Sequence, residues 1–126
     1  MTARLLIPAL VAFALPWVLA LVLRIRVGVS PNLGEEWSVL LFNGVWTSWP
    51  LVAWAVLARS RAPLAAGLLV ALLAWGYAGW DAVRYHIGGE GGGANIGLGL
   101  MLLALPALML AVMAATHAMA RARGSI

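Results

Sequence analysis

The sequence predicts an all-α membrane protein: four transmembrane helices in an up-down bundle, with the N and C termini on the cytoplasmic side. Of its 126 residues, 64% are hydrophobic and 10% are charged, and the mean hydropathy is +0.99. A water-soluble domain of this length needs a polar shell, and the polar residues are too few to form one. The apolar residues gather in four long runs, so we predict a single transmembrane domain over residues 1–126, with spans at about 5–23, 37–58, 64–83 and 96–118.

The first apolar run, residues 5–23, predicts an uncleaved span and not a signal peptide. It is longer than the apolar core of a usual signal peptide and ends in Arg24 and Arg26, with no small-x-small cleavage pattern after it. Pro8 lies in the first turn, where a missing backbone donor costs little. Pro16 lies at the centre, so we expect a kink there.

The second span follows a turn-rich loop over residues 28–34. Glu35 and Glu36 directly precede its apolar run. We expect both in the first turn of the helix, where the helix dipole favours anions. The five residues from Arg59 to Pro63 predict a tight connector between the second and third helices.

The third span begins near residue 64, and its helix is expected to continue past the apolar run through Asp81 and Tyr85. Five glycines among residues 88–93 then end the helix, because glycine gives little support to helical backbone. The fourth span begins at Ile96, where Asn95 is a candidate capping residue.

The charge distribution predicts how the four spans are oriented. Every basic residue is an arginine, and the net charge is +4 with a pI of about 11.2. Short positively charged segments tend to stay on the cytoplasmic side, which predicts a multi-pass protein of the bacterial inner membrane. The arginines occur singly or in pairs at span ends, so we expect contacts with membrane lipids and no binding of nucleic acid. The cytoplasmic side then holds Arg4, Arg59, Arg61, Arg121 and Arg123, and the opposite side holds Arg24, Arg26 and Arg84 together with Glu35, Glu36, Asp81 and Glu90.

A polar set within the second span is the first candidate ligand-binding site: Asn43, Thr47 and Ser48, with Trp46 and Trp49 beside them. Asn43 and Thr47 are four residues apart and share a helix face. One interpretation is a pocket for a ligand in the outer half of the membrane, rimmed by tryptophans. The other is hydrogen bonding between helices. We favour the second, because no ionisable group lies inside the span to drive transport.

A second candidate set, Asp81, Arg84, Tyr85 and His86, lies at the extracytoplasmic end of the third span. Imidazole and carboxylates are ligands that zinc accepts, and they can also act as an acid–base pair. Their spacing matches no metal motif, and Asp81 and Arg84, three apart on a helix, favour an ordinary ion pair. The chain also has no cysteine, which excludes thiolate metal sites and cysteine catalysis. We therefore predict no metal, no cofactor and no catalytic residue.

Met109, Met113 and His117 recur every four residues on one face of the fourth span. Thioethers and imidazole are ligands that soft copper accepts. Methionine at helical spacing is far more often packing, which is the interpretation we favour. Haem held by two histidines of one chain is disfavoured, because His86 and His117 are predicted at opposite faces of the bilayer.

These observations favour a non-enzymatic role, as an accessory, assembly or interaction subunit of a larger membrane complex. The alternative is a small transporter or a protein that binds a lipophilic ligand with the Asn43–Thr47–Trp49 region. A membrane enzyme using His86 and the carboxylates ranks third. We expect a homo-oligomer or an assembly with other membrane subunits, because glycines let helices approach closely in lipid. The glycines concerned are Gly67, Gly76, Gly79, Gly97 and Gly99.

In size and span number the chain resembles the small multidrug exporters, which are four-helix homodimers. The resemblance is confined to architecture. Those exporters carry an essential glutamate within their first helix, whereas residues 5–23 contain no acid. The arginine bias also disfavours the dual insertion seen in some such dimers.

Overall fold

The computed structural model describes the backbone of residues 3–27, 33–58, 60–88 and 96–124. It describes the surroundings of the side chains of residues 4–25, 38–58, 60–81 and 100–124, apart from Leu23 and Val39. All the secondary-structure elements within these residues are helices, which confirms the all-α prediction. A short 3₁₀ helix, η1 (Ala3–Leu6), leads into α1 (Ile7–Val27), which is followed by α2 (Leu33–Leu57), α3 (Arg61–Gly88) and α4 (Ile96–Ala122).

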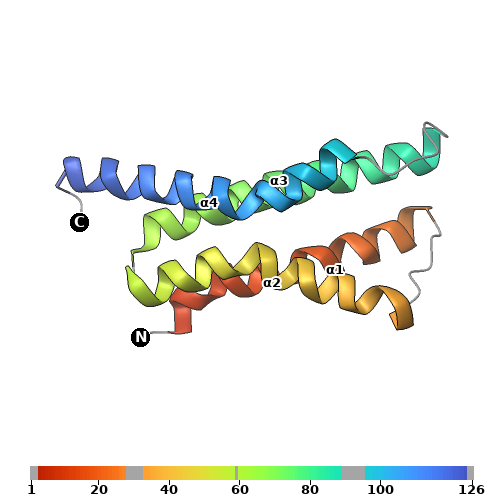
Figure 1. Ribbon diagram of the computed structural model, residues 1–126, viewed down its shortest axis with the longest axis horizontal. Coiled ribbons are helices and arrows are strands. Elements are labelled where there is room, and N and C mark those ends of the chain that lie inside the picture. Colours follow the sequence, from red (N-terminus) through yellow and green to blue (C-terminus); the bar gives the residue numbers. More distant parts are fainter. Residues whose placement is uncertain (1–2, 28–32, 59, 89–95, 125–126) are drawn as a thin grey trace.

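Consecutive helices run in opposite directions (Figure 1). The described ends of the chain lie at the same end of the bundle as the connection between α2 and α3. The most extensive packing joins α3 to α4 and α1 to both α2 and α3, while α2 makes smaller contacts with α3 and α4. Helix α3 therefore contacts all three of the others.

Each helix is longer than the apolar run that predicted it. Because α2 begins at Leu33, Glu35 and Glu36 lie in its first turn, as expected. Helix α3 continues beyond Asp81 to Gly88, also as expected. The predicted connector was too long, since α3 already begins at Arg61 and Pro63 lies in its first turn. Proline is compatible with a first turn because backbone donors there have no partner within the helix.

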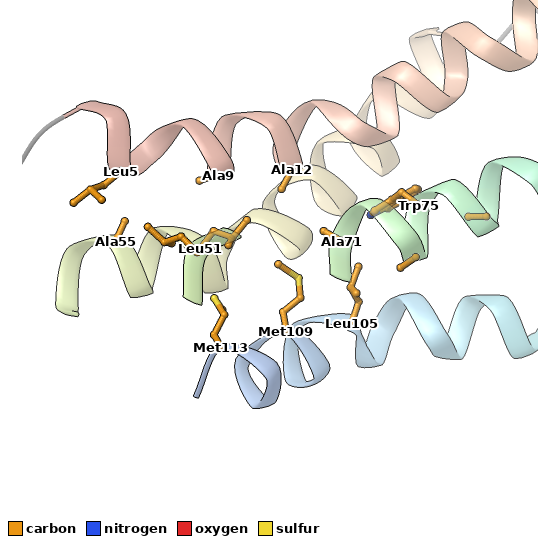
Figure 2. Packing of buried hydrophobic residues seen from close by; sticks show 13 residues of the cluster. Leu5, Ala9, Ala12, Leu51, Ala55, Ala71, Trp75, Leu105, Met109 and Met113 are labelled. Atoms are coloured by element: carbon orange, nitrogen blue, oxygen red, sulfur yellow. The ribbon is translucent and has the colours of Figure 1, made fainter. Parts of the chain in front are cut away.

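The interior of the bundle combines alanines with large apolar side chains, and many other large apolar side chains face outward. Figure 2 shows residues of all four α-helices and η1 converging on this core. Small residues at helix contacts and large apolar residues outside are what lipid favours, because tight packing and not exclusion of water joins helices there. The buried apolar residues are Leu5, Ala9, Ala12, Leu51, Ala55, Leu64, Ala71, Ala74, Trp75, Ala78, Leu105, Met109 and Met113.

All four α-helices are long and apolar enough to cross a membrane. The candidate membrane-spanning segments are Arg4–Val22, Leu40–Leu57, Arg61–Asp81 and Leu100–Ala122. The outward side chains include Leu10, Leu57 and Leu73, each more than 60% exposed. A water-soluble monomer rarely exposes apolar surface on this scale. By length and composition, the four helices are therefore candidate membrane spans.

Prolines lie within three of the helices and face the core. Helix α1 continues through Pro16, α2 through Pro50 and α4 through Pro106. All three side chains are buried. Each proline leaves the carbonyl four residues earlier without its helical donor. In lipid such a carbonyl needs another hydrogen-bond donor. Because these prolines face inward, the donor has to come from inside the bundle.

Candidate functional site

A hydrogen bond between Thr47 and Trp75 lies inside the bundle. The indole Nε1 of Trp75 on α3 donates to Oγ1 of Thr47 on α2 over 3.0 Å. Thr47 is 1% exposed and Trp75 is 8% exposed. Both groups are neutral, so the bond joins α2 to α3 without burying charge. Hydrogen bonding between helices was the interpretation favoured for this part of α2, and Thr47 makes such a bond.

Asn43 and Ser48 complete the polar residues of the first candidate site. Ser48 is buried, and its hydroxyl donates to the carbonyl of Val45 in its own helix over 3.3 Å. Asn43 is half-buried one turn from Thr47 and makes a noncovalent interaction of its own. Thr47 and Ser48 thus form hydrogen bonds within the chain.

The two tryptophans of this candidate site belong to an aromatic row on the outside of α2. The rings of Phe42 and Trp46 stack with their centroids 5.9 Å apart, and Trp49 lies 6.4 Å from Trp46. Phe42 and Trp49 are 54% and 39% exposed. The structure therefore places Thr47 and Ser48 in the interior and Trp49 on the outer surface.

Trp46 also joins α2 to α4. Its indole Nε1 donates to the backbone carbonyl of Leu103 over 3.1 Å. Pro106 interrupts the hydrogen bonding of α4 in this region, because it frees the carbonyl of Leu102. The indole thus meets α4 beside the turn that the proline weakens. This contact was not predicted from the sequence, because Pro106 marks the carbonyl of Leu102 as the one in need of a donor, whereas the indole bonds to that of Leu103.

Of the second candidate set, only Asp81 has a described side chain. It is 9% exposed near the end of α3 that lies away from the chain termini, and it makes an interaction there. Arg84, Tyr85 and His86 belong to the same helix, but their side chains lie outside the described residues, as does Glu90. The predicted ion pair and the enzyme hypothesis therefore stay predictions. Among the described residues, no three His, Asp or Glu side chains are grouped so as to hold a metal.

Met109 and Met113 are completely buried, as favoured for packing residues. The sulfur of Met113 lies against Gly67 of α3, since a Cβ added to that glycine would be 2.6 Å from it. One turn further along α4, the ring of His117 meets Trp54 of α2 edge to face, with centroids 5.6 Å apart. Trp54 in turn donates from Nε1 to Oγ of Ser60 over 2.9 Å. The Trp54–Ser60–His117 group was not predicted from the sequence.

The glycines of the bundle differ in what surrounds them. A Cβ added to Gly44 would lie 2.8 Å from both the backbone oxygen of Phe13 and a ring carbon of Trp17. At Gly67 and Gly79 the space for a Cβ is likewise taken up, by the side chains of Met113 and Leu19 respectively. Gly76, on the exposed side of α3, has nothing within 4 Å. Of the predicted contact glycines, Gly67 and Gly79 thus serve contacts within the chain, and Gly97 and Gly99 lie outside the described side chains.

Comparisons with models of protein families, with curated proteins and with solved structures found no match.

Proposed function

We propose that this chain is a subunit of a membrane complex in the bacterial inner membrane. It binds membrane helices of another chain, either a second copy of itself or a different protein. The observation that carries the proposal is the open surface at Gly76. The structure describes the surroundings of four glycines within helices. At three of them, Gly44, Gly67 and Gly79, another helix of the chain fills the space beside the glycine. Of these four glycines, Gly76 is the one that leaves room for a helix from outside. Glycine also weakens a helix relative to alanine, by up to about 1 kcal/mol.

The hydrogen bonding inside the bundle supports the same role. Thr47 bonds with Trp75, Ser48 with its own helix, and Thr116 with the carbonyl of Val112 over 2.8 Å. Of these bonds, the one between Thr47 and Trp75 joins two helices, and the other two pair a hydroxyl with a carbonyl of its own helix. The open space beside Gly76, the notch of this surface, allows the backbone of another helix to approach α3 closely. Such close packing drives helix association in lipid.

Gly76→Leu should abolish association while leaving insertion intact. The leucine fills the notch and keeps the outside helix from approaching α3 closely. Native mass spectrometry of the protein from its own membrane, in mild detergent and in native nanodiscs, measures the assembly. Ala14→Leu is the matched control, because Ala14 is exposed on α1. A monomer in both preparations of the unaltered protein would overturn the proposal.

A crosslinking experiment identifies the partner at this surface. Because the chain has no cysteine, Gly76→Cys carries a single thiol. Oxidation should give a disulfide-linked dimer if α3 packs against α3 of a second copy, since a disulfide needs Cα atoms within about 7 Å. A heterologous partner would leave the thiol uncrosslinked and be found instead as a second protein of fixed stoichiometry. Ala14→Cys should not crosslink in either case.

Reporter fusions test the proposed orientation, in which both termini lie in the cytoplasm. The prediction rests on five arginines at the proposed cytoplasmic side against three arginines and four acids opposite. Fusions after Ser125 and within residues 59–63 should report the cytoplasm. Fusions at Asn32 and Gly91 should report the other side. A cytoplasmic signal from Gly91 would contradict the orientation.

A protein that binds a lipophilic ligand is the second candidate, and the aromatic row of Phe42, Trp46 and Trp49 favours it. Two of these rings are well exposed within a segment apolar enough to lie in the membrane. Flat apolar molecules stack on such rings. Extraction and mass analysis of the small molecules that copurify with the protein tests this role. A stoichiometric ligand lost in Trp49→Ala, with no protein partner, would favour it over the subunit.

A further inference from the structure

Four arginines lie at the end of the bundle where the described chain begins and ends. Arg4 belongs to η1, Arg61 begins α3, Arg121 lies in the last turn of α4 and Arg123 directly follows that helix. Figure 1 shows the starts of η1 and α3 and the end of α4 at this end. All four arginine side chains are exposed. The positive charge here therefore comes from three separate elements and faces outward.

The described residues provide no carboxylate to neutralise this charge. The first turns of η1, α1 and α3 contain no acid. The one acid whose side chain is described, Asp81, lies near the opposite end of α3. Glu35 and Glu36, in the first turn of α2, also belong to that opposite end. Among the described residues, nothing therefore competes with an outside anion for the four arginines.

Exposed apolar side chains lie close to these arginines along the chain. Ile7, Leu57 and Met119 are 53%, 83% and 55% exposed. The candidate membrane spans also begin or end at or beside the arginines. In a membrane this arrangement places the guanidinium groups at the level of the headgroups and the apolar side chains at the level of the acyl chains. A phospholipid offers a partner to both, whereas a soluble anion offers one only to the arginines.

We propose that this end of the bundle binds anionic phospholipids in preference to zwitterionic ones. The arginines bind the headgroup phosphates, and the exposed apolar side chains contact the acyl chains. A guanidinium group can form two parallel hydrogen bonds to one phosphate. A headgroup with net negative charge adds an attraction that a zwitterionic headgroup lacks. Such binding requires that the four candidate spans insert in the membrane, but not that a second chain packs at Gly76.

Native mass spectrometry of the delipidated protein in mild detergent measures this preference. The probes are phosphatidylglycerol and phosphatidylcholine with the same acyl chains. The unaltered protein should bind phosphatidylglycerol more tightly. Each of the four arginines replaced by glutamine should lower the ratio of the two dissociation constants by up to about fivefold, which corresponds to about 1 kcal/mol. The variants are Arg4→Gln with Arg61→Gln, and Arg121→Gln with Arg123→Gln.

Arg24→Gln is the matched control. Arg24 is exposed on α1 near the opposite end of the bundle, so the same charge is removed far from the four arginines. The lipid preference should stay unchanged in this variant. It should also stay unchanged in Gly76→Leu, which separates lipid binding from association with another chain. Equal binding of the two lipids by the unaltered protein would overturn the proposal. So would an unchanged preference in both double variants, or an equal loss in Arg24→Gln.

Soluble competitors separate a lipid from a free anion. Inorganic phosphate and a hexaglutamate peptide are added at the same concentration of negative charge as the phosphatidylglycerol. Neither should displace the bound lipid, because neither has acyl chains for the exposed apolar side chains. Displacement by phosphate would indicate a site for a free anion, and displacement by the peptide would indicate a site for an acidic protein segment. Either result would overturn the assignment to lipid.

Discussion

Gly44→Ala should separate α1 from α2 and destabilise the bundle by about 1–3 kcal/mol, the usual cost of overpacking. The added methyl group would lie 2.8 Å from the backbone oxygen of Phe13 and 2.8 Å from the ring of Trp17. A backbone oxygen can move only if α1 moves with it. The Trp17 ring is itself packed on Phe13, with centroids 4.9 Å apart. The measurement is unfolding by sodium dodecyl sulfate in mixed micelles, followed by tryptophan fluorescence.

Gly76→Ala is the matched control for this prediction. The chemical change is the same, but the new methyl group meets nothing within 4 Å. Alanine is the better helix former, by up to about 1 kcal/mol, so stability should be unchanged or slightly higher. Both variants are compared at a protein concentration at which the chain is monomeric, which removes any effect on association. Equal destabilisation by the two substitutions would show that position 44 is not a close contact between helices.

The helices could be predicted from the sequence because their signal is length and composition. An apolar run of about 20 residues is enough to predict a span. The ends were less well predicted, as Arg61 shows. An apolar run marks what lies in hydrocarbon, whereas a helix continues into the headgroups wherever its residues permit. Charged residues such as Glu35 and Arg61 are therefore no sign that a helix has stopped.

Which side of each helix faces inward is much harder to predict in this chain. In a soluble bundle the apolar side faces the core, but here lipid is as apolar as the core, so periodicity carries little information. Polar and small residues carry the remaining signal. This signal correctly predicted that Thr47 faces another helix. It could not predict its partner Trp75, which lies 28 residues away and reads as one apolar residue among many.

The Trp54–His117 contact was missed for a related reason. His117 was considered with Met109 and Met113, because the three share one side of α4. In the structure the methionines pack in the core, and the histidine pairs with a tryptophan of another helix. Spacing along one helix indicates which residues share a side. It does not indicate which layer of the bundle each reaches, because that depends on how the helices are staggered.

Thr47→Val is expected to destabilise the bundle by about 1 kcal/mol, measured by the same unfolding experiment. Valine has nearly the shape of threonine but cannot accept a hydrogen bond, so Nε1 of Trp75 would remain buried without a partner. Thr47→Ser is the matched control. Thr47→Ser keeps the hydroxyl and loses a methyl group. It should therefore retain the hydrogen bond and lose less unfolding free energy than Thr47→Val, through weaker packing.

A double-mutant cycle separates this bond from the packing around it. Trp75→Phe removes the donor and also leaves unfilled space in the core, so its cost alone should exceed that of Thr47→Val. Once the donor is gone, the Thr47 hydroxyl can bond to a carbonyl of its own helix, as Thr116 does over 2.8 Å. Adding Thr47→Val to Trp75→Phe should then cost clearly less than Thr47→Val in the unaltered protein, with a coupling of about 0.6–1.7 kcal/mol. Strict additivity would mean that the two groups stabilise the bundle independently, so that this hydrogen bond adds no stability of its own.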